Sequence, residues 1–169
     1  MSGLLSARGL GLSVAVLTFA VDQANKLWLI FVYGIAARQP VHLTPFFDVV
    51  FAKNPGISYS LLSASGEAGR WGLLAVTFVA TAFLLLWLYR SRTKFTALSL
   101  GLIIGGALGN AADRFAYGFV ADFYHFHIRG FSWYVFNLAD VAIVVGVAML
   151  LVESVFAKAG LEQGESAQT

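Results

Sequence analysis

Two aspartates, Asp122 and Asp140, stand at the ends of a short, aromatic-rich stretch of an otherwise apolar sequence. An ionised carboxylate near hydrocarbon costs roughly 3 kcal/mol on insertion scales, so two of them need an explanation. Two carboxylates that lie close together share a proton, and then one can activate water while the other protonates or polarises a carbonyl. The pair therefore indicates aspartyl hydrolysis, and the amides of Asn54 and Asn137 are candidate donors to the oxyanion.

The same stretch allows a second chemistry, which is a metal site. Asp122, His125 and His127 offer oxygen and nitrogen ligands. However, a fourth ligand is not evident, and a His-x-His pair in an extended segment is common by chance. We therefore expect no metal and no cofactor.

The composition of the chain indicates the kind of fold that must position Asp122 and Asp140. The chain has 169 residues, of which 59% are hydrophobic and only 12% are charged. This is too apolar for a soluble domain, and we expect one compact membrane bundle over residues 1–159. A net charge of +2 from scattered basic residues argues against a nucleic-acid partner. The lack of cysteine excludes disulfides and a cysteine nucleophile.

Four segments have enough apolar residues to cross a bilayer, at about residues 10–33, 71–89, 95–112 and 136–156. The predicted fold class is therefore an all-α membrane protein with four transmembrane helices. The short loop after the second segment is basic, which places this loop and both termini in the cytoplasm. Residues 160–169 are expected to be a disordered cytoplasmic tail. The first segment resembles a cleaved signal peptide, but three further spans favour a retained helix.

The first helix carries Asp22 and Lys26, four residues apart and hence on one helical face. They form either an intrahelical ion pair, with Lys26 reaching toward the interface, or a part of the site. In both cases this face should point into the bundle.

The segment between the first two helices, about residues 36–62, is rich in β-branched and aromatic residues and predicts short strands. We expect a small extracytoplasmic β-cradle there. It leads into Asn54-Pro55-Gly56, where proline and glycine favour a turn that fixes the Asn54 amide. That amide either reaches a partner or closes a local Asx turn.

The third helix carries Gly101, Gly105 and Gly109, a spacing that lets another helix approach closely. Asn110, Asp113 and Arg114 follow at its outer end and are expected to brace a site.

The fourth helix begins at Asn137, a good N-cap residue, and Asp140 lies three residues further on. A capping pair would explain Asn137 well, whereas we favour a functional role for Asp140.

Five motifs now stand in a recognisable order. They are Asp22-Gln23-Ala24-Asn25-Lys26, Asn54-Pro55-Gly56, Gly105-Gly106-Ala107-Leu108-Gly109-Asn110-Ala111-Ala112-Asp113-Arg114, Val120-Ala121-Asp122-Phe123 and Phe136-Asn137-Leu138-Ala139-Asp140. In this order and topology they resemble bacterial lipoprotein signal peptidase, also called signal peptidase II. The resemblance covers nearly the whole chain.

This resemblance implies an aspartic peptidase of the bacterial inner membrane, with no metal or cofactor. It would remove signal peptides from prolipoproteins by cutting just before a diacylglyceryl-modified cysteine. The implied partners are prolipoproteins and membrane lipids, and the implied state is a monomer with its site near the periplasmic face. The implied site residues are catalytic Asp122 and Asp140, substrate-binding Asn54, Gly56, Asn110, Arg114 and Asn137, and supporting Asp22, Lys26 and Asp113.

Four positions depart from the family pattern, namely Asn25, Pro55, Tyr59 and Ala121. Two rival functions use the same residues. A small transporter or channel subunit would use Asp22, Asp122 and Asp140 to pass protons or cations, but it favours acids spread across membrane depth. A structural assembly helper would use the glycine stripe but leaves the paired acids unexplained.

Overall fold

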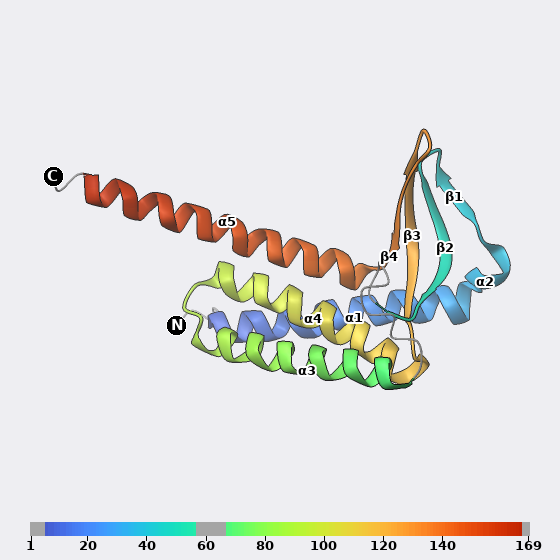
Figure 1. The fold of residues 1–169 in the computed structure, drawn as a ribbon, viewed down its shortest axis with the longest axis horizontal. Helices are drawn as coiled ribbons and strands as arrows, with labels where there is room; N and C mark the ends of the chain where they lie inside the picture. Colours follow the sequence, from blue (N-terminus) through green and yellow to red (C-terminus); the bar gives the residue numbers. More distant parts are fainter. Residues whose placement is uncertain (1–5, 57–66, 167–169) are drawn as a thin grey trace, which may run out of the picture.

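The computed structural model describes the backbone of residues 6–56 and 67–166 and the side chains of these residues up to 156 (Figure 1). The elements in chain order are α1 (Ala7–Leu27), the π-helix η1 (Trp28–Tyr33), α2 (Ile35–Arg38), β1 (Val41–Thr44), β2 (Phe47–Asn54), α3 (Glu67–Arg90), α4 (Lys94–Tyr117), β3 (Val120–Ile128), β4 (Phe131–Phe136) and α5 (Leu138–Ser166).

Within the described part of the chain, four helices are long and apolar enough to cross a membrane, which confirms the predicted architecture. They cover Ala7–Tyr33, Glu67–Arg90, Lys94–Tyr117 and Leu138–Phe156. Helix α4 is the central one, because it packs against α1, α3 and α5. On the outer helices, large apolar side chains such as Val79 and Val144 are exposed, as expected where lipid covers them.

The glycine stripe of α4 explains its close approach to α1. A Cβ atom at Gly101 would lie 2.5 Å from the Gly11 carbonyl oxygen, and one at Gly105 would lie 2.5 Å from the Ala15 carbonyl oxygen. Only glycine fits at either contact, since the facing atoms belong to backbone. The packing role predicted for these glycines is confirmed.

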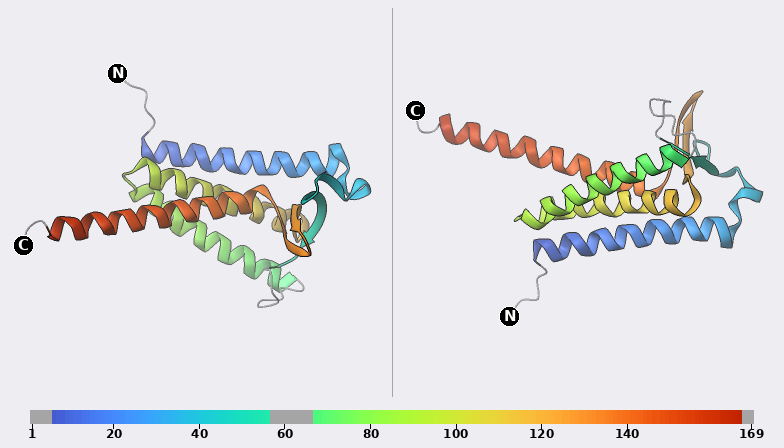
Figure 2. Two further views of the ribbon diagram at one scale, coloured as in Figure 1. Left: turned by 90° about the horizontal axis from the view of Figure 1, so that it is seen from above. Right: turned by 60° about the horizontal axis from the view of Figure 1, so that its bottom comes forward.

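The four strands form one antiparallel sheet in the order β1-β2-β3-β4. The sheet lies at one end of the bundle, and the N- and C-terminal ends of the chain lie at the other (Figures 1 and 2). Strands β1 and β2 confirm the predicted cradle. Strands β3 and β4 were not predicted, so half of the sheet comes from the connection between α4 and α5.

Helix α5 differs from the prediction at its C-terminal end. It continues to Ser166, through most of the segment expected to be a disordered tail. Leucine, glutamate and glutamine in this segment favour a helix, and α5 continues through Gly160 and Gly164, which favour it less. Figure 1 and the left view of Figure 2 show this end extending beyond the rest of the bundle.

Candidate active site

Asn137 joins the two aspartates of the predicted pair. Its side-chain nitrogen donates to Asp122 Oδ1 at 2.6 Å, and its backbone N–H donates to Asp140 Oδ2 at 3.2 Å. Asn137 is fully buried, and Asp122 is only 3% exposed. One residue at the junction of β4 and α5 thus brings the carboxylates from β3 and α5 to a common site.

The start of α5 is a reciprocal capping arrangement. Asn137 Oδ1 accepts from the Asp140 backbone N–H at 2.9 Å, while Asp140 returns a bond to the Asn137 backbone. This satisfies two N–H groups at the helix end. The predicted cap at Asn137 is confirmed, and Asp140 takes part in the same cap. The other oxygen of Asp140 accepts a hydrogen bond from Asn110 Nδ2 at 2.8 Å. The same carboxylate therefore caps α5 and contacts a residue of the candidate site.

Asp122 receives a second amide from the turn after β2. Asn54 Nδ2 donates to Asp122 Oδ2 at 3.1 Å, and Asn54 Oδ1 accepts from the Gly56 N–H at 3.2 Å. The two alternatives for Asn54 are therefore both true, since a local Asx turn aims its amide at the acid. Pro55 does not prevent this turn.

Burial raises the pKa of Asp122 to about 6, and the nearby charge of Asp140 adds to the rise, whereas the Asn137 and Asn54 hydrogen bonds oppose it. Asp122 therefore changes its protonation state near neutral pH. This is a suitable range for a group that must both donate and accept a proton during hydrolysis.

Three buried ionised side chains lie behind the pair. Lys26 Nζ is 2.8 Å from Asp22 Oδ2 and 2.9 Å from Asp113 Oδ2, and it donates to Asn110 Oδ1 at 3.2 Å. Lys26 is only 2% exposed, so it does not reach toward the interface. The face of α1 that carries Asp22 and Lys26 points into the bundle, as predicted.

Asp22 and Asp113 hold the two segments that carry the predicted pair by their backbone. Asp22 Oδ1 accepts from the N–H of Ala139 at 2.9 Å, and Asp113 Oδ2 accepts from the N–H of Ala121 at 3.1 Å. Ala139 precedes Asp140 and Ala121 precedes Asp122. Each supporting acid thus fixes the peptide next to one member of the pair.

Sequence reasoning missed the role of Gln23. Its side-chain nitrogen donates to Asp22 Oδ2, Asp113 Oδ1 and the Gly109 carbonyl oxygen at 3.1–3.2 Å. The available signal was a further amide within the polar patch of an otherwise apolar helix.

Asn25, one of the positions that depart from the family pattern, accepts a hydrogen bond from the Tyr124 hydroxyl at 3.0 Å. Tyr59 lies outside the described residues.

Arg114 is placed differently from Asp113, as their adjacent positions on α4 predicted. Its positive charge acts on Asp140 and Asp122, and no direct hydrogen bond joins it to either acid among the described residues. Its Nε is buried without a hydrogen-bond partner there. This N–H is a free donor beside the pair.

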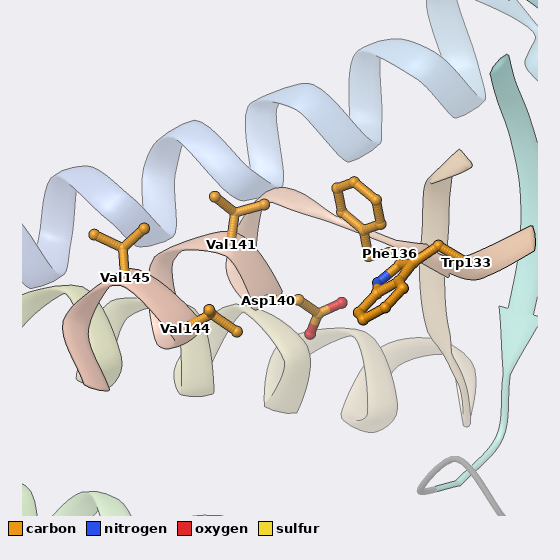
Figure 3. Close-up of a pocket in the computed structure, with 6 residues that line it drawn as sticks. All are labelled: Trp133, Phe136, Asp140, Val141, Val144 and Val145. Carbon is orange, nitrogen blue, oxygen red and sulfur yellow. The ribbon is translucent and has the colours of Figure 1, made fainter. Parts of the chain in front are cut away.

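An apolar pocket of about 290 Å³ opens next to Asp140 (Figure 3). Its lining residues are Trp133, Phe136, Asp140, Val141, Val144 and Val145. The valines follow α5 away from the acid, and the Asp140 carboxylate points toward Trp133 in Figure 3. A second apolar pocket between α1, α4 and α5 shares Val141 and Val145. The first turns of α5 are therefore lined by two neighbouring apolar pockets.

The alternative metal set of Asp122, His125 and His127 does not form. Side chains alternate between the two faces of a strand, so Asp122 lies on the opposite face of β3 from both histidines. The acid that does approach them is Asp48, on β2.

A bundle of four membrane-spanning helices with two facing aspartates at its sheet end defines a membrane-embedded peptidase of the aspartic class. The comparisons with known proteins are more specific. Residues 14–156 match the sequence model of the family described as Signal peptidase (SPase) II. The chain belongs to this family.

Curated relatives agree with this assignment. The chain is 67% identical to the lipoprotein signal peptidase of Methylocella silvestris over 160 residues, which cover 95% of this chain and 94% of the relative. It is 59% identical to that of Beijerinckia indica over 150 residues, which cover 89% and 90%.

Solved structures support the fold. One bacterial membrane enzyme structure, obtained by the in meso method at 2.3 Å, superposes with a TM-score of 0.77 at 23% identity and covers 89% of this chain and 90% of the other. A second, at 1.9 Å, gives a TM-score of 0.72 at 25% identity and covers 85% and 90%.

Proposed function

We propose that this protein removes signal peptides from prolipoproteins by cleaving just before a diacylglyceryl-modified cysteine, with Asp122 and Asp140 as its catalytic residues. The observation that carries the proposal is the bridging of both carboxylates by Asn137. Family membership supplies the substrate class. The apolar pocket beside Asp140, and the second one that shares Val141 and Val145 with it, supply the environment that an acyl chain or a signal helix needs.

In this mechanism Asp122 carries the shared proton and Asp140 accepts one from water. Burial raises the pKa of Asp122 to about 6, so its protonated form stays populated up to about pH 6, where a carboxyl of ordinary pKa is already ionised. Asp140 lies in the first turn of α5, where the helix dipole favours negative charge. The activated water attacks the scissile carbonyl, and Asp122 then protonates the leaving nitrogen.

The remaining site residues divide into two groups. Arg114, with its free Nε–H, binds the substrate backbone beside the pair, and Asn54 and Gly56 form the turn that meets the substrate. Asn110 and Asn137 orient the acids. The amides of Asn54 and Asn137 already donate to Asp122, so they stabilise the oxyanion only if those bonds change during the reaction.

We further propose the location and state of the protein. The basic loop residues Arg90, Arg92 and Lys94 lie at the end opposite the sheet, which favours cytoplasmic termini and a site at the periplasmic side of the inner membrane. One chain supplies every residue of the hydrogen-bonded network, so a monomer suffices.

The test is cleavage of a diacylglyceryl-modified prolipoprotein by the purified protein in detergent. We expect Asp122→Asn and Asp140→Asn to lose at least about 1,000-fold of the activity, since each removes one half of the acid–base pair. The matched control is Glu67→Gln, which changes an exposed carboxylate at the start of α3. A chelator should leave the wild-type rate unchanged.

Each other result points to a different conclusion. Activity that survives either substitution would remove that aspartate from the mechanism. Activity lost to a chelator would indicate a catalytic metal. Absence of cleavage by a well-folded wild type would favour proton or cation transport, which a liposome flux assay would then detect.

A further inference from the structure

All three histidines of the chain gather around one carboxylate, that of Asp48. His42, Asp48 and His125 stand in one row across β1, β2 and β3, because His42 pairs with Asp48 and Asp48 pairs with His125 in the sheet register. His127 lies two residues further along β3 and so on the same face. The proposed dyad does not use this cluster, since Asp122 belongs to the other face.

The distances within the cluster are short. His42 Nδ1 is 2.7 Å from Asp48 Oδ1, and His127 Nε2 is 3.0 Å from Asp48 Oδ2. One potential ligand atom each from Asp48, His125 and His127 lies within 4.8 Å of the others. The Asp48 side chain is only 10% exposed, whereas that of His42 is 70% exposed and that of His127 is 34% exposed. Within the cluster, the Asp48 carboxylate is thus nearly buried, whereas His42 and His127 are accessible to solvent.

We propose that Asp48, His125 and His127 bind a divalent transition-metal ion of the zinc type, with His42 orienting the carboxylate from outside. Imidazole and carboxylate are the ligands that such ions take in proteins. The site would lie on the face of the sheet away from Asp122, and it is independent of the peptidase function.

The geometry requires little rearrangement. Around a tetrahedral zinc ion, neighbouring ligand atoms are about 3.3 Å apart, given bond lengths of about 2.0–2.1 Å. The Asp48 Oδ2 to His127 Nε2 distance of 3.0 Å is already close to this value. The widest pair must close by about 1.5 Å, which side-chain rotation can supply.

Two neighbours would hold the ligands in place, as outer contacts do in metal sites. His42 holds Asp48 Oδ1, so Oδ2, which His127 Nε2 contacts at 3.0 Å, is the oxygen that would face the ion. Ser132 Oγ, on β4, is 2.7 Å from His125 Nε2 and fixes that ring. A water molecule would complete the coordination.

The proposal predicts an effect of the ion on the fold. A bound ion would join β2 to β3 and, through His42, to β1. Because the ion would bind only the folded sheet, its binding should raise the thermal unfolding temperature.

The test is titration of the detergent-purified full chain, freed of any polyhistidine tag, with zinc chloride in a calorimeter. We expect one saturable site per chain. His127→Gln keeps a hydrogen-bond donor for Asp48 but removes the imidazole, and it should weaken binding at least about 100-fold. His42→Ala should weaken it about 10–100-fold. The control Glu67→Gln, which changes an exposed carboxylate outside the cluster, should bind as the wild type does.

Cobalt(II) gives a second readout that does not depend on stability. Tetrahedral coordination should produce visible absorption bands in the wild type, and these should be lost in His125→Ala. The absence of saturable zinc binding in the wild type would overturn the proposal and leave a hydrogen-bonded ion-pair cluster. Equal affinity in wild type and His127→Gln would overturn it as well.

Discussion

Replacing Lys26 by methionine tests the buried charges behind the dyad. In the wild type, Lys26 balances one of two buried carboxylates, and each of the three side chains is no more than 3% exposed. Methionine has a similar length but no charge, so the variant leaves both Asp22 and Asp113 without a cation. Breaking a buried ion pair in this way costs about 3–5 kcal/mol, because the remaining charge stays desolvated.

That cost is large enough to measure by thermal unfolding in detergent. For a chain of this size it corresponds to a fall in Tm of roughly 6–20 °C. Lys53→Met is the matched control, since Lys53 is exposed and its ammonium lies over the Phe119 ring, away from any buried carboxylate. The control should shift Tm by less than about 2 °C.

A second variant separates charge from packing. Lys26→Met combined with Asp22→Asn and Asp113→Asn removes all three charges, and it should recover part of the lost Tm. If Lys26→Met alone unfolds like the wild type, the two carboxylates are not held as ions and our account of the network fails. If the triple variant is less stable than the single one, side-chain packing rather than charge explains the loss.

Two further predictions follow from the structure. Because burial raises the pKa of Asp122 to about 6 and the mechanism needs its protonated form, kcat/KM should fall tenfold per pH unit above about pH 6. A rise through this range would instead make Asp122 the base. Gly105→Ala would place a Cβ 2.5 Å from the Ala15 carbonyl oxygen and should cost about 1–3 kcal/mol in thermal unfolding. Gly72→Ala, with no neighbour within 4 Å, is its control, and equal stability of the two would refute the contact.

Local chemistry made several features predictable from the sequence. The four spans follow from the length of their apolar runs. The Asn137 cap follows from residue type and position, because capping involves only residues within one turn. The glycine spacing on α4 predicted a close helix contact but not the partner, which is α1.

Features that depend on distant pairing could not be predicted. Strands β3 and β4 contain polar and aromatic residues that an extended loop would also accept, and they become strands because β2 offers a free edge to β3. For the same reason the His125 and His127 pair suggested a metal set with Asp122, whereas the register supplies Asp48. The role of Gln23 could not be predicted either, because its partners Gly109 and Asp113 lie on another helix, α4.

The arrangement of the supporting acids explains why this site contains buried charge at all. The proposed catalytic aspartates come from separate elements, β3 and α5, so their relative position must be fixed through the backbone of each. A peptide N–H is held most strongly by an ionised acceptor, and Asp113 and Asp22 provide one for Ala121 and one for Ala139. Two such anions would repel each other inside the bundle, and Lys26 between them removes this penalty. Lys26 is therefore buried because Asp22 and Asp113, which position the segments of Asp140 and Asp122, need a cation between them.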